Sequence, residues 1–274
     1  MLEMITKRDS KYFSEIGKMG GLARIKKLGN PGTEAGRAKG GRNAVLKIKV
    51  LQKLGVVKAF KAQKRIGSIK RDSVLAEFIG VLFGDGHVGK YQTSITLDSK
   101  NDREYADYLK SIIENKFGVT AKLSFRKNAR ALDLTVSSVA FSRQMVRFGM
   151  VEGNKLRKGL HIPEWVTSSR VYTQAFLRGV FDTDGCVYSE IKKIKGKEYR
   201  YIGMAFASAS PIFCGEIAVA LRELGFLPTY TARQKSVYLR KQSSVNAYFT
   251  RVSSHNPKHS VRYEMFRLEK CESG

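Results

Sequence analysis

The sequence predicts an α+β protein made of two pseudo-symmetric halves, each with the order α-β-β-α-β-β-α, preceded by a basic arm that is helical or flexible. Two short stretches, residues 78–86 and 177–185, share a pattern of apolar residues, one central glycine and a final Asp-Gly pair. Each stretch is followed by a similar succession of predicted strands and helices. Residues 1–71 lie outside this repetition and are rich in lysine, arginine and glycine.

The composition indicates a globular protein with a polyanionic partner. The 274 residues carry a net charge of +26, and 42% of them are hydrophobic. A charge this large favours nucleic acid as the partner, ahead of an anionic membrane surface. No apolar run approaches the ~20 residues that span a bilayer, and the N-terminus lacks the hydrophobic core of a signal peptide. We expect a cytoplasmic or nucleoid-associated protein without a membrane partner.

Cysteine usage excludes two further classes of protein. Cys186, Cys214 and Cys271 are isolated from one another, with no CxxC pair. A disulfide framework or a zinc finger would need paired cysteines. Neither is indicated here.

The arm at residues 1–71 contains 19 lysines and arginines against 4 acidic residues. A glycine-rich stretch at residues 17–21 is echoed at 36–41, on either side of a turn-rich segment at 28–32. These stretches resemble the short Lys-Gly-Gly repeats of some small basic proteins, and the apolar spacing over 45–54 predicts a helix. We expect the arm to add phosphate contacts to nucleic acid. The alternative is a basic tail that only adds solubility.

The first element of each half is predicted to be a helix that ends near the Asp-Gly pair. Asp72 or Ser73 is placed to cap the first of these helices, and Ser168 or Ser169 the second. A mid-helix glycine costs ~1 kcal/mol relative to alanine, so two glycines at the same offset need a physical reason. We expect the two helices to pack closely through Gly80 and Gly179.

Asp85 and Asp184 fall at the C-terminal ends of these two helices. The helix macrodipole disfavours negative charge there, and two neighbouring carboxylates repel each other. Such a pair stabilises a fold poorly but suits the binding of divalent cations. One such stretch alone would be read as an ordinary buried helix that ends in an Asp-Gly turn. The presence of both favours a shared site.

The remaining elements repeat in the two halves. In the first half we expect a hairpin over 88–97, a helix over 103–117, strands over 119–126 and 131–137, and a helix over 138–148. In the second half we expect strands over 187–194 and 199–207, a helix over 211–224, strands over 229–235 and 245–252, and a last helix over 260–269. A linker near 160–165 holds the only tryptophan. We therefore place the halves at 72–166 and 167–274.

The paired stretches resemble the two motifs of a single-chain LAGLIDADG homing endonuclease. The second is the closer match, with Asp182 and Asp184 on both acidic positions, whereas the first has Phe83 at the earlier one. The resemblance implies packed motif helices and a saddle of two antiparallel sheets that lies along double-stranded DNA. It also implies a monomeric, intron-mobility type of endonuclease that hydrolyses one phosphodiester bond in each strand with Mg²⁺ or Mn²⁺.

The same resemblance assigns site residues. Asp85 and Asp184 would hold the metal, together with Gly84 and Thr183. A lysine near the end of each half would assist catalysis, and the sequence offers Lys155 and Lys258. The family's polar residue near the end of the second strand, often glutamine, has no clear counterpart, because the halves offer Asp98 and Ser208 there.

Strand alternation would turn one face of each sheet towards the major groove. Basic and amide side chains on the predicted hairpins are the candidate DNA contacts: Lys90, Gln92, Arg126, Lys127, Arg130, Lys192, Lys193, Lys195, Lys197, Arg200, Arg233, Arg240 and Lys241.

Other classes of protein compete with this interpretation. A non-cleaving RNA maturase or DNA-binding regulator would keep the same architecture, with RNA as the partner of a maturase. An intein would need a Cys or Ser junction and a C-terminal His-Asn, whereas the His255-Asn256 pair is internal and precedes Pro257. A basic chromatin-type protein would explain the charge but not the paired motifs.

Overall fold

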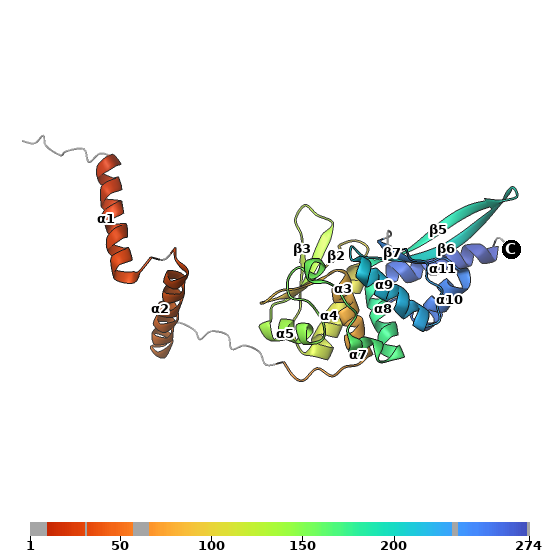
Figure 1. Ribbon diagram of the computed structural model, residues 1–274, viewed down its shortest axis with the longest axis horizontal. Coiled ribbons are helices and arrows are strands. Elements are labelled where there is room, and N and C mark those ends of the chain that lie inside the picture. The colour runs from red at the N-terminus through yellow and green to blue at the C-terminus, as the bar shows by residue number, and fades with distance from the viewer. Residues whose placement is uncertain (1–9, 31, 57–65, 232–234, 273–274) are drawn as a thin grey trace, which may run out of the picture. The chain divides into compact units, whose positions relative to one another are not determined.

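The computed structural model describes residues 10–30, 32–56, 66–231 and 235–272, and the chain divides into two compact units, Met1–Ala62 and Gln63–Gly274 (Figure 1). The first unit contains helices α1 (Ser10–Leu28) and α2 (Glu34–Lys53), and Thr33 caps α2 by accepting a hydrogen bond from the Gly36 amide. None of the described side chains of α2 is buried. No helix in the described part of the chain is both long and apolar enough to cross a membrane.

The first half of the second unit has the predicted order α-β-β-α-β-β-α. Its elements are α3 (Ser73–Gly84), β1 (Gly86–Val88), β2 (Thr93–Asp98), α4 (Arg103–Phe117), β3 (Lys122–Phe125), β4 (Ala131–Val136) and α5 (Val139–Arg147). The strands form an antiparallel sheet in the order β1-β2-β4-β3. Thr93, Ile95 and Leu97 point into the core as the alternation predicted.

Two short helices, α6 (Lys155–Lys158) and α7 (Glu164–Thr167), connect the halves. The second half follows with α8 (Arg170–Asp184), β5 (Gly185–Ile194), β6 (Lys197–Ala207), α9 (Pro211–Glu223), β7 (Ser236–Leu239), α10 (Gln242–Arg251) and α11 (Pro257–Glu272). Among the described residues, its sheet has three strands in the order β5-β6-β7. The two antiparallel sheets and the packed motif helices confirm the predicted α+β fold.

One strand prediction in the second half was wrong, and another falls partly outside the described residues, which omit 232–234. Residues 245–252 lie in and just after helix α10, and within 229–235 the described residues contribute only an isolated bridge from Thr229 to Tyr238. Tyr, Phe, Thr and Val favour strands when read locally, but tertiary packing overrides that preference. Tyr248 lies 5.3 Å from the ring of Phe181 and 5.8 Å from that of Phe206, a contact that a helix provides.

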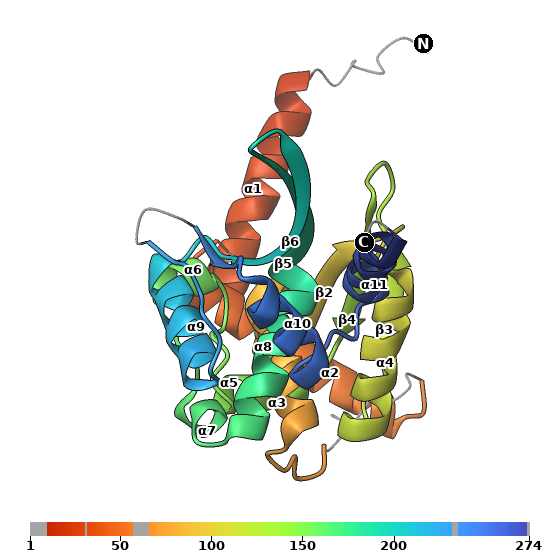
Figure 2. The ribbon, with the colours of Figure 1, turned by 90° about the vertical axis from the view of Figure 1, so that its right-hand side faces the viewer.

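The centre of the second unit is the contact between α3 and α8, which run side by side (Figure 2). A Cβ added at Gly80 would lie 2.1 Å from the carbonyl oxygen of Phe176, and one added at Gly179 would lie 2.1 Å from that of Glu77. Only hydrogen at these positions lets the two backbones approach this closely. Residues 75–84 of α3 are buried throughout.

Hairpins project from this body. The β5–β6 hairpin extends well past it, and residues 189–200 are exposed along its outer part (Figure 1). Lys195 and Gly196 form its tight turn with positive φ angles of 50° and 78°. The strands of this exposed hairpin are much longer than those of the β1–β2 hairpin in the first half. The two halves therefore differ in the length of their corresponding hairpins.

The segment before α3 belongs to the second unit. Ile66 and Ile69 pack against the hydrophobic core, and the Arg71 guanidinium lies 5.7 Å from the ring centre of Trp165. The Tyr172 hydroxyl also donates a hydrogen bond to the Arg71 carbonyl at 3.2 Å. A truncation that removes only the arm should therefore stop near residue 62.

We expect Gly80→Ala and Gly179→Ala each to destabilise the second unit by about 2 kcal/mol or more, because overpacking against backbone has no flexible side chain to yield. Urea unfolding measures the change. Gly215→Ala in α9 is the matched control, because its Cβ would meet nothing closer than Tyr230 Cε1 at 3.8 Å. The control should be neutral or stabilising by up to about 1 kcal/mol. Equal effects at all three positions would contradict the close-packing explanation.

Candidate active site

The ends of the two motif helices form the candidate site. Asp85 is the C-cap of α3, directly before β1, and Asp184 is the last residue of α8, directly before β5. A Cβ added at Gly84 would lie 2.0 Å from Thr183 Oγ1 and 3.4 Å from Asp184 Cγ. The packing of the helices therefore brings the two Asp-Gly ends together, at the point where both sheets begin.

The two carboxylates lie in a partly buried, mutually repulsive environment. Burial raises the pKa of Asp184 to about 6, and the charge of Asp85 adds to that effect. Burial also raises the pKa of Asp85, while the positive charges of Lys258 and Lys155 act in the opposite direction. A bound cation would relieve both the desolvation and the repulsion.

Lys155, at the start of α6, reaches the end of α3. Its Nζ donates hydrogen bonds to the carbonyl oxygens of Phe83 at 2.7 Å, Gly86 at 3.0 Å and Leu82 at 3.1 Å, and also to that of Gly84. Carbonyls at a helix C-terminus have no partner within the helix and carry the negative end of its dipole. The ammonium group thus caps α3, although burial lowers its pKa.

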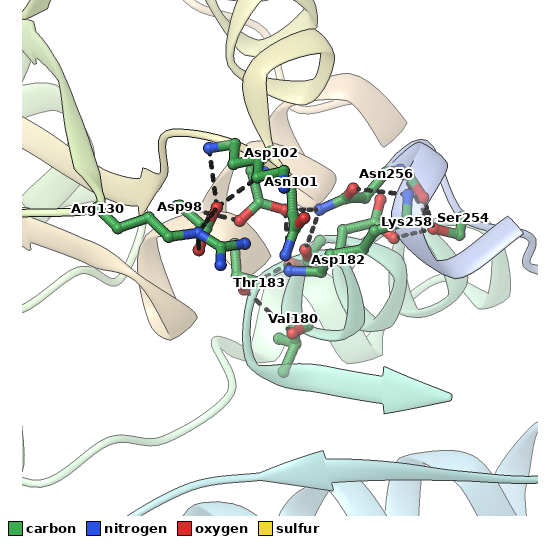
Figure 3. A network of polar contacts seen from close by, with 12 residues as sticks. Asp98, Asn101, Asp102, Arg130, Val180, Asp182, Thr183, Ser254, Asn256 and Lys258 are labelled. Atoms are coloured by element: carbon green, nitrogen blue, oxygen red, sulfur yellow. Dashed lines mark hydrogen bonds and ion pairs between the residues drawn. The ribbon is translucent and has the colours of Figure 1, made fainter. Parts of the chain in front are cut away.

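Lys258, at the start of α11, is held differently. Its Nζ lies 2.9 Å from Asp102 Oδ1, and the Asn256 side-chain amide donates to the same oxygen at 2.8 Å (Figure 3). Asp102 is the N-cap residue of α4, but its side chain makes no capping hydrogen bond. The sequence pattern predicted only the helix that follows Asp102, over 103–117, because a contact between the two halves leaves no local pattern.

Asp182, the additional acidic residue of the second motif, is fully buried away from solvent. Its carboxylate accepts hydrogen bonds from the Ser254 hydroxyl and from the His255 amide, the latter at 2.9 Å, and Asn256 donates to its carbonyl oxygen at 2.8 Å. Burial raises the pKa of Asp182 to about 7. These contacts fasten the segment before α11 to the end of α8.

A second polar cluster crosses the α3–α8 interface, about one helical turn before Asp182 on α8. Glu77 on α3 forms a 2.6 Å ion pair with Arg178 on α8 and accepts a hydrogen bond from the Tyr108 hydroxyl at 2.9 Å. His255 Nδ1 lies 2.7 Å from Glu77 Oε1. Although burial alone would raise the pKa of Glu77, the contacts with His255 and Arg178 lower it.

Ligand atoms of Glu77, Asp182 and His255 lie within 4.8 Å of one another, which meets the spacing of a metal site. Arg178 already neutralises Glu77, and the segment before α11 already satisfies the Asp182 carboxylate. This cluster is built to join the halves rather than to bind an ion.

Beside Asp184, the structure has a cavity of about 460 Å³ whose lining includes Gly84, Lys155, Ser208 and Lys235. The Ser208 amide donates to the Lys235 carbonyl at 2.9 Å. In the first half, Asp98 is engaged by Arg130 at 3.0 Å and by two amides of its own turn. The side chains considered for the missing polar position are thus already engaged, since the Ser208 hydroxyl accepts a hydrogen bond from the Ser210 amide at 3.2 Å.

The oxygen donors at the helix ends fit a hard divalent cation. Carboxylates and backbone carbonyls are the ligands that Mg²⁺, Mn²⁺ and Ca²⁺ prefer. Asp85 and Asp184 supply the carboxylates, with Gly84 and Thr183 beside them. The resemblance placed Gly84 at the metal site, but its carbonyl oxygen already accepts a hydrogen bond from Lys155 Nζ.

The candidate DNA contacts within the described residues lie on exposed turns and strands. Lys90 and Gln92 occupy the β1–β2 turn, Lys127 occupies the β3–β4 turn, and five others line the β5–β6 hairpin. Some are already paired: Arg126 with Asp133 at 2.7 Å, Arg130 with Asp98, and Lys193 with Glu198 at 3.0 Å. Arg240 and Lys241 follow β7, and Arg233 lies outside the described residues.

The fold and the paired helix ends define a LAGLIDADG-type architecture, and comparison with known proteins supports that class. Residues 172–257 match the family described as a LAGLIDADG-like domain. The crystal structure of the LAGLIDADG meganuclease I-AabMI bound to uncleaved DNA superimposes with a TM-score of 0.51 at 10% identity, over 74% of this chain and 92% of that one. The chain therefore contains a LAGLIDADG-like domain and has the meganuclease fold.

Curated relatives match over only part of their length. A tRNA-splicing ligase RtcB of Methanopyrus kandleri is 28% identical over 62% of this chain and 19% of the relative, and one of Pyrococcus abyssi is 24% identical over 77% and 25%. This chain thus spans about a fifth to a quarter of their length. The ligase activity in their names belongs to those whole proteins.

His259 on α11 is buried in the core of the second half. Its ring lies 4.6 Å from that of Phe181, and neither ring nitrogen has a hydrogen-bond partner among the described residues. Burial and the neighbouring Lys258 lower its pKa to about 3. At this site the unfolded chain binds a proton near pH 6.5 and the folded chain does not, so the contribution of His259 to stability falls as the pH drops below about 6.5.

We expect His259 to lower the free energy of unfolding by about 2 kcal/mol between pH 7 and pH 5, since the linkage slope approaches 1.4 kcal/mol per pH unit. Urea unfolding at several pH values measures the slope. His259→Leu and His259→Gln should both remove this part of it, and His259→Leu should also remove the two unpartnered nitrogens. A slope unchanged in both variants would contradict the assignment.

Proposed function

We propose that the chain is a homing endonuclease, a site-specific enzyme that hydrolyses one phosphodiester bond in each strand of a long double-stranded DNA target with Mg²⁺ or Mn²⁺. The observation that carries this proposal is the meeting of Asp85 and Asp184 at the adjoining ends of α3 and α8. Two partly buried carboxylates, each with a pKa raised by burial, have no structural benefit in this position, but they suit a divalent-cation site.

The residues have separable roles in this proposal. Asp85 and Asp184 hold the metal, which when bound stabilises charge on the attacking and leaving oxygens of the phosphodiester. Lys155 and Lys258 place positive charge beside both carboxylates. Asp102 and Asn256 act as positioning residues, because their contacts orient Lys258.

The DNA partner is supported by the charge and by the arrangement of the sheets. Each sheet starts where its motif helix ends, so a duplex on the sheets would pass over the carboxylates. The net charge of +26 and the exposed basic hairpins suit a polyanion. The meganuclease with this fold was solved bound to DNA. Both motif helices come from one chain, so a monomer would be sufficient. Intron mobility enters the proposal from the resemblance to homing endonucleases alone.

A second candidate is a non-cleaving regulator or RNA maturase on the same fold. The observation that favours it is the ammonium group of Lys155 on the Gly84 carbonyl, which restricts metal access on that side. Cleavage with metal separates the two candidates, because the second would bind nucleic acid and leave it intact.

Asp85→Asn and Asp184→Asn should each lower double-strand cleavage by about a thousandfold or more, because metal stabilisation of the transition state contributes several kcal/mol. Duplex binding should stay largely intact, since removing a carboxylate reduces repulsion with phosphate. Plasmid cleavage and a gel-shift titration measure the two quantities. Asp107→Asn on the exposed face of α4 is the matched control for the charge change. Wild-type cleavage rates in either site variant would contradict the metal-site assignment.

Removing residues 1–62 should weaken binding to target and scrambled duplexes by a similar factor, because phosphate contacts carry no base information. The slope of log affinity against log salt should become shallower by about 0.9 for each phosphate that the truncated protein no longer neutralises. Binding titrations at several salt concentrations measure this slope.

The other outcomes identify the arm's role as well. An unchanged salt slope would show an arm that only adds solubility, and an altered sequence preference would show one that reads bases. Retaining residues 66–71 keeps their core contacts, so the truncated protein is expected to fold as the full chain does.

A further inference from the structure

The two lysines of the candidate site are held in chemically different ways. Lys258 pairs with a carboxylate, Asp102, at 2.9 Å. Lys155 instead donates to four backbone carbonyls from residues 82, 83, 84 and 86. A ring of carbonyl oxygens around a positive centre is the kind of ligand set that proteins also use for metal cations.

One of these carbonyls belongs to the candidate metal site. Gly84 lies between Asp85 and the neighbouring helix end, where its Cα faces Thr183 and Asp184. A divalent cation on the Asp85 side that used the Gly84 oxygen would lie within a few ångströms of the Lys155 ammonium. Two positive charges at that separation repel each other strongly in a partly buried site.

We propose that the Lys155 ammonium is a built-in cation of the candidate site, which caps α3 and competes with a divalent ion for the Gly84 carbonyl. The two halves then bind metal unequally in the free protein. A divalent ion that uses the Gly84 oxygen then binds more weakly than one that does not, because Lys155 already occupies that oxygen. This inference rests on the proposed metal site at Asp85 and Asp184.

Burial supports this role for Lys155. The side chain is only partly accessible, and its ammonium has more carbonyl oxygens within reach than the three N–H donors it carries. The carbonyls it serves include those that α3 leaves without helical partners. Removing the ammonium would leave these oxygens available to another cation.

The test compares Ca²⁺ binding by the full chain in the absence of DNA. Isothermal titration of the wild type should show one ion bound more tightly and a second bound at least about tenfold more weakly, because a like charge faces the second position. In Lys155→Met, the affinity for the second ion should rise by about tenfold or more. The metal-free melting temperature of this variant should fall, and Ca²⁺ should raise it by more than it does in the wild type.

Lys158→Met is the matched control. Lys158 lies on the same short helix, and its Nζ donates to the carbonyl of Glu152 at 2.8 Å, outside the site. The control changes the net charge equally and should leave both Ca²⁺ affinities as in the wild type. An equal rise in Lys155→Met and Lys158→Met would overturn the proposal, because it would reflect net charge alone.

Two further outcomes separate this inference from the proposed function. If the wild type binds Ca²⁺ and Lys155→Met binds it with the same affinities, the inference is wrong and the metal site stands. If neither protein binds Ca²⁺, the metal site itself is overturned together with the inference. If Lys155→Met does not fold, the wild-type titration still decides. Two ions bound with equal affinity would contradict the proposal that the two positions bind metal unequally.

Discussion

The close approach of α3 and α8 is the constraint on which the rest of the structure depends. Gly80 and Gly179 place each backbone against a carbonyl of the other helix, and no larger residue fits at either position. The same approach brings Asp85 and Asp184 together and starts both sheets from one point. A wider separation would divide the candidate site into two unrelated carboxylates.

Polar groups reinforce this interface in addition to the apolar packing. The Glu77–Arg178 pair joins the two helices directly, and the segment before α11 extends the contact through His255, Asn256 and Asp102. Buried charges are tolerated here because each one has a partner of opposite charge or several hydrogen bonds. The network also sets the position of Lys258, so the packing of the halves and the electrostatics of the site are coupled.

The halves share a plan but differ in detail. The first half has a four-stranded sheet and an ammonium group on its helix end, and the second half has a long basic hairpin and a lysine paired with a carboxylate. A single chain can diverge in this way because each half is free to change while the helix interface is kept.

The sequence by itself determined the repeated motifs, the packing glycines and the order of the first half, because these depend on local pattern. Its net charge predicted the class of partner, a polyanion. The sequence predicted strands at 229–235 and 245–252, where the second of these segments folds as α10 since Tyr248 packs against Phe181 and Phe206. Only the tertiary structure decided that Asp182 fastens a segment, that Asp102 holds Lys258 and that Lys155 caps α3. Each of these contacts joins residues far apart in the chain, and no local periodicity records which distant groups will meet.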